Sequence, residues 1–87
     1  MPYDLSFFSE DHDYWLGTDP ESKRHVLGIP VSNPMVDYIE TYWLDEKHYV
    51  GFTDRPDLAV EFADACRRRE HDDLLTHKPG RNRGAPR

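Results

Sequence analysis

Residues 32–44 read Ser-Asn-Pro-Met-Val-Asp-Tyr-Ile-Glu-Thr-Tyr-Trp-Leu, and their conformation decides how the chain divides into helices and strands. Asn33 can cap a helix with its side-chain oxygen, and Pro34 suits the first helical position because its missing N–H would lack a partner there. Apolar side chains then recur at helical spacing, at Met35, Val36, Ile39, Tyr42 and Trp43. This pattern predicts a helix that runs to about Leu44 and ends at Asp45-Glu46-Lys47.

The segment before residue 32 has the patterns of short strands. Tyr3, Leu5 and Phe7 alternate with polar residues, and Tyr14-Trp15-Leu16-Gly17 is a short apolar run. Residues 18–22 contain Asp19 and Pro20, which favour a turn, and residues 24–31 then resume an apolar pattern. We therefore expect antiparallel strands near residues 3–7, 14–17 and 24–31, with the second and third paired as a hairpin.

The segment after Lys47 predicts a fourth strand, Tyr49-Val50-Gly51-Phe52, and then a second helix. Asp54 is the expected cap of that helix, and Asp57 falls in its first turn, where the helix dipole favours negative charge. Its expected inner stripe is Leu58, Phe62, Ala65 and Cys66.

The predicted order is therefore β-β-β-α-β-α, an α+β fold. We expect a small mixed or antiparallel four-stranded sheet with the two helices packed on one face. A helical connection between the third and fourth strands would make those two strands parallel if they share the sheet.

The 87 residues fall into two regions of different composition. Residues 1–75 are expected to form one acidic domain. Residues 76–87 hold two prolines, two glycines, four basic residues and no large apolar side chain, so they cannot bury enough surface to offset the entropy of ordering. They are expected to form a disordered basic tail.

Cysteine content and hydropathy indicate a cytoplasmic protein. The single cysteine, Cys66, cannot form an internal disulfide, and no apolar run approaches the ~20 residues of a membrane span. The N-terminal residues lack the basic and long apolar segments of a secretory signal. We expect no membrane partner.

Charge is the main guide to function. Residues 1–66 hold 14 acidic and four basic residues, whereas residues 67–87 hold three acidic and seven basic residues. A dense negative field speeds association with a positively charged partner and can imitate nucleic-acid phosphates. We therefore expect a non-enzymatic binding protein, without a cofactor, that captures a basic protein such as a nuclease or another nucleic-acid-binding protein. An immunity protein or a phage-encoded anti-defence protein would be the most concrete form, as a monomer or homodimer that does not bind nucleic acid directly.

The predicted first helix is the preferred binding face. Two tyrosines one turn apart offer large contact areas at low entropy cost, and acidic residues surround them. Burial in the core is an equally strong alternative, because Ile39, Tyr42 and Trp43 also fit the inner stripe of that helix. The candidate residues are Asp37, Tyr38, Glu40, Thr41 and Tyr42, with Asp45, Glu46, Asp54 and Asp57 at the rim.

Two alternative functions remain open. Imidazole and carboxylate groups suit transition metals, so a metal-binding module or hydrolase could use the runs Asp11-His12-Asp13 and His71-Asp72-Asp73. Neither run has the ligand spacing of a known metal motif, and solvated surface side chains explain both. A self-associating assembly protein is the other alternative, through an exposed Trp15 or Tyr42.

Arg67-Arg68-Arg69 could contact phosphates, although a helix-end cluster that complements the dipole explains it more simply.

Overall fold

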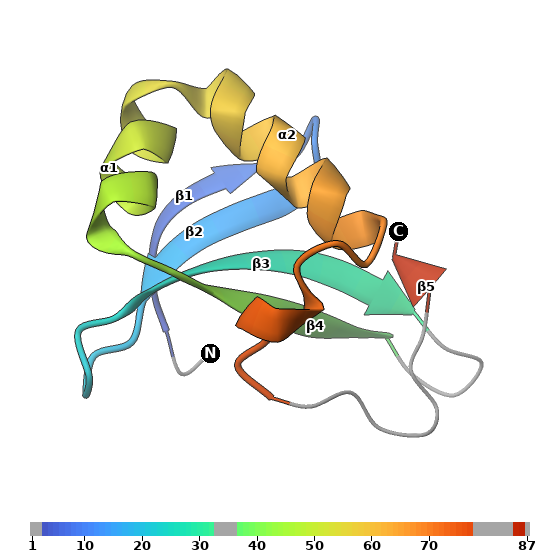
Figure 1. The fold of residues 1–87 in the computed structure, drawn as a ribbon, viewed down its shortest axis with the longest axis horizontal. Helices are drawn as coiled ribbons and strands as arrows, with labels where there is room; N and C mark the ends of the chain where they lie inside the picture. Colours follow the sequence, from blue (N-terminus) through green and yellow to red (C-terminus); the bar gives the residue numbers. More distant parts are fainter. Residues whose placement is uncertain (1–2, 33–36, 78–84, 87) are drawn as a thin grey trace.

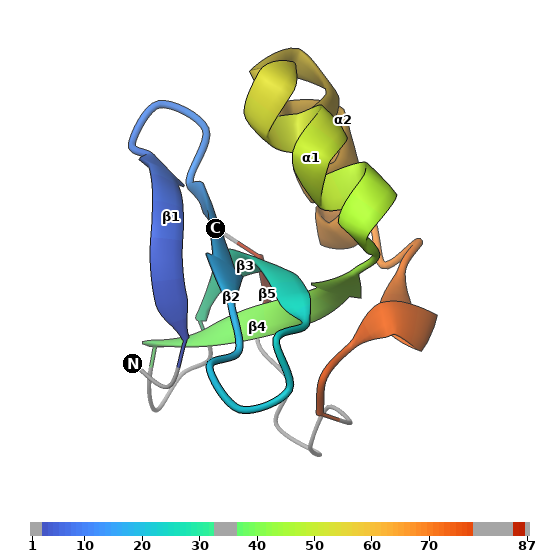
Figure 2. The same cartoon turned by 90° about the vertical axis from the view of Figure 1, so that its left-hand side faces the viewer.

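The computed structural model describes residues 3–32, 37–77 and 85–86, and in them an antiparallel sheet carries two helices on one face (Figures 1 and 2). The strands follow the spatial order β1-β2-β3-β4, and a short β5 pairs with β3. The elements are β1 (Asp4–Ser9), β2 (Tyr14–Thr18), β3 (His25–Ser32), β4 (Asp37–Leu44), α1 (Glu46–Asp54), α2 (Pro56–Arg67), the 3-10 turn η1 (Asp72–Leu74) and β5 (Ala85–Pro86). The α+β class and the β2–β3 hairpin are confirmed.

The helix predicted over residues 34–44 is wrong, because residues 37–44 form strand β4. This segment satisfies two periodicities, since aromatic and β-branched side chains at alternate positions also suit a strand. β4 pairs antiparallel with β3 along its whole length, from Ser32 opposite Asp37 to His25 opposite Leu44. Long-range pairing with β3 therefore overrides the local helical pattern. The predicted helix start at Asn33–Pro34 lies outside the described residues.

The strand predicted at residues 49–52 is also wrong, because these residues lie inside α1. Asp45, expected to end a helix, begins this one: its Oδ1 accepts the His48 N–H at 2.7 Å. A side-chain oxygen that caps the first turn is a strong helix-start signal. The order is consequently β-β-β-β-α-α, and the predicted parallel crossover is replaced by an antiparallel β3–β4 pair.

The second predicted helix is confirmed as α2, with differences at its start and on its inner face. Arg55 rather than Asp54 is the N-cap residue, because Asp54 still belongs to α1. Asp57 lies in the first turn, as expected. The buried side chains of α2 are small, namely Ala59, Ala63, Ala65 and Cys66, whereas Leu58 is exposed. Small residues allow the helix backbone to approach the sheet closely.

The main core lies between the helices and the facing side of the sheet. Its members are Tyr14 and Leu16 of β2, Leu27, Ile29 and Val31 of β3, Tyr42 and Leu44 of β4, Phe52 of α1, and Ala59, Ala63 and Cys66 of α2. Burial of these apolar side chains supplies most of the driving force for folding, at about 25 cal/mol per Å² removed from water.

The opposite face of the sheet is closed by Trp15 instead of a helix. Trp15 is 3% exposed, and its ring lies over Gly17 of β2 and Gly28 of β3. A Cβ added at Gly28 would lie 2.5 Å from Trp15 Nε1, closer than real Cβ atoms approach. Both glycines are therefore needed for the tryptophan to lie flat against the sheet.

The expected basic tail is described only in part. Thr76 donates its N–H to the Thr41 carbonyl at 2.9 Å, and Leu75 bridges to Tyr42, so residues 75–76 lie along the outer edge of β4. Ala85–Pro86 pairs with Val31 and Ser32 of β3. Residues 78–84 and 87 lie outside the described residues, and the division into a domain and a tail stays a prediction. Within the described chain, no helix is long and apolar enough to cross a membrane.

Candidate interaction surface

Three of the five residues predicted for the binding face between Asp37 and Tyr42 are buried in this structure. Glu40, Thr41 and Tyr42 are buried in β4, at 6%, 9% and 0% exposure. Tyr38 is half-buried and packs against the core, and the Asp37 side chain lies outside the described residues. A helix would place Tyr38 and Tyr42 one turn apart, whereas strand alternation directs Tyr38, Glu40 and Tyr42 toward the helices.

The four rim residues are exposed but form two separate groups. Asp45 and Glu46 lie at the start of α1, and Asp54 and Asp57 lie at the junction of α1 and α2. The nine residues of α1 separate the two groups by about 13 Å. The structure therefore does not bring the nine predicted residues together as one site.

Buried Glu40 belongs to a polar network that holds the sheet to the end of α2. The Tyr42 hydroxyl donates to Glu40 Oε1 at 3.1 Å, and Arg69 Nη1 lies 3.7 Å from the same oxygen. Arg69 has a positive φ of 66°, which directs the chain back toward β4. This pairing compensates a buried carboxylate and has a structural role.

The arginines at residues 67–69 are engaged within the protein. Arg67 pairs with Asp64 at 2.9 Å and donates to the His12 and Asp13 carbonyls at 2.8 and 2.5 Å. Arg68 pairs with Glu70 at 2.6 Å, and this bond, the largest effect on both groups, raises the pKa of Arg68 and lowers that of Glu70. The cluster therefore does not form an open phosphate-binding patch. Its first arginine fastens the β1–β2 turn to α2.

That attachment assembles a surface of carboxylates from two distant parts of the sequence, which we call the acidic surface. Its members are Glu10, Asp11 and Asp13 of the β1–β2 turn, and Asp57, Glu61 and Asp64 of α2, all exposed. Asp57 pairs with Arg55 at 3.2 Å and Asp64 with Arg67, whereas no ion pair within the described chain involves the other four. Figure 1 shows the turn behind α2, and the Arg67 side chain links the two through the His12 and Asp13 carbonyls. The spacing of residues 57, 61 and 64 could have indicated the helical stripe, but only the fold places the turn next to it.

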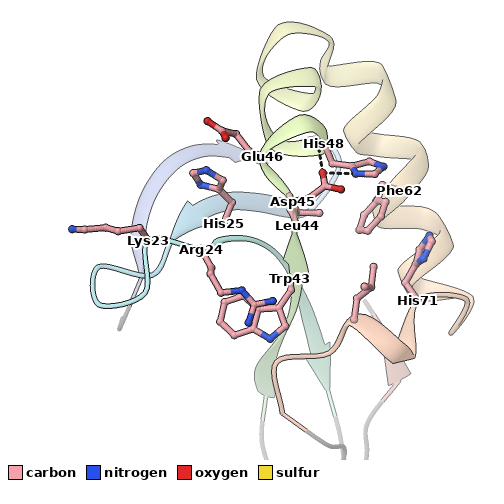
Figure 3. A pocket seen from close by; sticks show the side chains of 11 residues that line it. Lys23, Arg24, His25, Trp43, Leu44, Asp45, Glu46, His48, Phe62 and His71 are labelled. Carbon is pink, nitrogen blue, oxygen red and sulfur yellow. Dashed lines mark hydrogen bonds and ion pairs between the residues drawn. The ribbon is translucent and has the colours of Figure 1, made fainter.

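A pocket of about 660 Å³ lies where the β2–β3 turn, the start of α1, α2 and η1 meet (Figure 3). Arg24 stacks over the Trp43 ring with 4.0 Å to the centroid, and the Phe62 and His71 rings stack at 4.4 Å. The other lining residues are Lys23, His25, Leu44, Asp45, Glu46, His48 and Leu74. Among the described residues, this lining includes no serine, threonine or cysteine.

Asp45 positions His48 at the wall of this pocket. Asp45 Oδ1 lies 2.7 Å from His48 Nδ1 and also accepts the His48 backbone N–H. The backbone N–H first, and the imidazole second, lower the pKa of the Asp45 carboxyl below its ordinary value of 3.8.

The two histidine–carboxylate runs are not assembled into a metal centre in the described part of the chain. No group of three or more His, Cys, Asp or Glu side chains there is placed to hold a metal ion. Cys66 is fully buried on the inner face of α2, as expected, and burial raises its pKa to about 12. A thiol in that state is a packing residue and a poor nucleophile.

In comparisons with known proteins, the chain matches no family model, no curated protein and no solved structure.

Proposed function

We propose that this protein is a non-enzymatic acidic binding protein that captures a basic protein partner in the cytoplasm. The observation that carries the proposal is the acidic surface, where Glu10, Asp11, Asp13 and Glu61 are exposed and have no ion-pair partner among the described residues. Inhibition of a nucleic-acid-acting enzyme is the most concrete form, because a basic substrate-binding groove offers complementary charge.

The physical argument concerns the rate of association. Carboxylates one helical turn apart lie about 5–6 Å from each other at Cβ, so their fields add. Such a field raises the association rate with a cationic partner by about 10–10³, and salt screens it within about 8–10 Å. The whole chain carries a net charge of −6, which adds to the effect at longer range.

The binding face differs from the one expected from the sequence. The proposal uses the acidic surface and retains Asp57, whereas Glu40, Thr41 and Tyr42 are buried and cannot contact a partner without a change in the fold. Asp54 lies next to Asp57 at the helix junction and extends the negative field there.

A charge-matched pair of variants tests the proposal. Asp11→Asn/Glu61→Gln removes two unpaired carboxylates from the acidic surface, and Glu21→Gln/Asp73→Asn removes two exposed carboxylates elsewhere. Partners are captured from extracts of the source cell at several salt concentrations, identified by mass spectrometry, and their association rates are then measured with purified proteins.

We expect a basic partner whose association slows about tenfold with the first variant and less than about twofold with the second. Recovery of only acidic or neutral partners, at a level that salt does not change, would reject the proposal. Equal slowing by both variants would show that overall charge acts and that the acidic surface has no special role.

A further inference from the structure

The first strand, β1, is an open edge of the sheet. Among the described residues β1 pairs only with β2, and Figure 2 shows it at the left margin of the sheet. The opposite edge, β4, is paired near its middle, where Leu75 bridges to Tyr42 and Thr76 donates its N–H to the Thr41 carbonyl. An edge strand directs alternate N–H and C=O groups outward, where they can pair with another chain.

The side chains of β1 are unusually apolar for an open edge. Leu5, Phe7 and Phe8 are 50%, 40% and 58% exposed. The strand, Asp-Leu-Ser-Phe-Phe-Ser, contains no lysine or proline, which are residues that commonly protect edges from pairing. Phe7 lies opposite Leu16 and Phe8 opposite Trp15, so the two exposed rings lie on opposite faces of the edge. An irregularity between Leu5 and Phe7 leaves Phe7, Phe8 and Ser9 in regular register with β2.

The outer face offers a hollow beside this edge. Phe8 is paired with Trp15 and therefore lies on the same face as that ring. Phe8, Trp15, Pro30 and Ile39 line a hollow of about 200 Å³, together with Asp13 and Tyr14. Ile39 is 43% exposed there. Phe8 forms the wall of the hollow nearest the open edge, so the apolar surface of the edge continues onto the outer face of the sheet.

Charge distinguishes the possible occupants of the edge. Asp4 begins β1, and Glu10 and Asp11 follow it directly. In an antiparallel pair of two copies, Asp4 of one copy would approach the acidic end of the other, and like charges at such positions are destabilising. Basic side chains at both ends of an added strand would instead meet carboxylates. The edge therefore fits a basic extended segment better than a second copy.

We propose that β1 binds an extended segment of the basic partner as an added strand. The six residues of β1 span about 20 Å and can pair with about six partner residues. Apolar side chains of that segment lie beside Leu5, Phe7 and Phe8, and flanking lysines or arginines lie beside Asp4 and Glu10. This inference rests on the proposed function and adds the mode of docking.

The test uses the full chain and two pools of nine-residue peptides. In the basic pool, two lysines at each end flank five central positions chosen from Val, Ile, Phe and Thr, and in the acidic pool glutamates replace the lysines. Affinity is measured by fluorescence anisotropy, and hydrogen exchange of the β1 amides is measured with and without peptide.

We expect the basic pool to bind at least tenfold more tightly than the acidic pool and to slow exchange at Phe7 and Phe8 at least tenfold. Phe8→Lys should weaken binding at least tenfold. The matched control is Val50→Lys on α1, because Val50 is 55% exposed and the change in charge is the same. Leu5→Lys is the second edge variant should Phe8→Lys fail to fold.

The outcomes separate this inference from the proposed function. If Asp11→Asn/Glu61→Gln weakens the basic partner but the edge variants do not, docking at β1 is wrong and the acidic surface still acts. If neither has an effect, both proposals fail. Failure of the basic pool to bind would overturn the inference. So would protection of β1 that rises with protein concentration alone, because a second copy would then occupy the edge.

Discussion

The contact between Gly28 and Trp15 makes a quantitative prediction. Replacing Gly28 with alanine puts a methyl group 2.5 Å from Trp15 Nε1 and closer still to two ring carbons. Two responses are possible. The ring can stay in an overpacked site, at a cost of about 1–3 kcal/mol. It can instead move out and lose its buried area, and about 150–250 Å² at about 25 cal/mol per Å² gives roughly 4–6 kcal/mol.

Overpacking costs less than loss of the buried ring area, so the Trp15 ring stays in place and overpacking determines the loss of stability. Alanine also restricts the unfolded chain more than glycine does, and this effect reduces the net loss of stability by about 0.5–1 kcal/mol. Because two Trp15 ring carbons lie even closer to the added Cβ than Nε1 does, the overpacking cost falls near the upper limit of about 3 kcal/mol. Less the offset of about 1 kcal/mol, we expect Gly28→Ala to lower the free energy of unfolding by about 2 kcal/mol, and Tm by about 8–16 °C for a domain of this size.

Urea unfolding followed by tryptophan fluorescence and by circular dichroism measures this effect. Gly51→Ala is the control, because its added Cβ meets nothing within 4 Å and it lies inside α1. That variant should gain about 0.5–1 kcal/mol from helix propensity. A double variant, Gly28→Ala/Trp15→Leu, should be more stable than the sum of the two single changes predicts, by about 1 kcal/mol.

A loss of less than about 0.5 kcal/mol for Gly28→Ala, or additivity of the two changes, would contradict this prediction. Either result would mean that the Trp15 ring does not lie over Gly28.

Three further predictions concern single side chains. The pKa of Asp45 is lowered in the folded protein, so its ionised carboxyl contributes stability above the ordinary pKa of 3.8, and this stability is lost as the pH falls through the folded pKa. The free energy of unfolding should therefore fall below about pH 4 in a pH series of urea titrations. Asp45→Asn can still cap α1 and should flatten that part of the series. Because the Cys66 pKa is raised to about 12, its thiol should react with a disulfide reagent at least about a hundredfold more slowly in the folded protein than in urea, and rapid native labelling would show that α2 does not cover it. Tyr42→Phe removes the donor to Glu40 and should cost about 1.5–3 kcal/mol in urea unfolding, whereas no loss would show that Glu40 is satisfied by other groups.

Local signals predicted the parts of the fold that depend on neighbouring residues. The turn at Asp19–Pro20 and the apolar runs around it identify the β2–β3 hairpin. Asp57 and the apolar spacing after it identify α2, although the first residue of that helix differs. In both cases the residues that specify the element lie within it or directly beside it.

The candidate site could be predicted only in part. Composition shows that the body is acidic, and it indicates which residues can carry charge. It does not show that Glu40 is buried against Arg69, or that Arg67 brings the turn at residues 10–13 beside α2. These facts depend on contacts between residues that are far apart in the sequence.

The sequence by itself determined the α+β class, the β2–β3 hairpin, the second helix and the burial of Cys66, because each follows from composition, turn chemistry or local periodicity. Only the tertiary structure decided the conformation of residues 37–44. Their side chains suit a helix and a strand, and pairing with β3 along eight positions settles the choice. That choice moves the helix start to Asp45, buries Tyr42 and Glu40, and leaves the acidic surface and the β1 edge as the exposed candidates for binding.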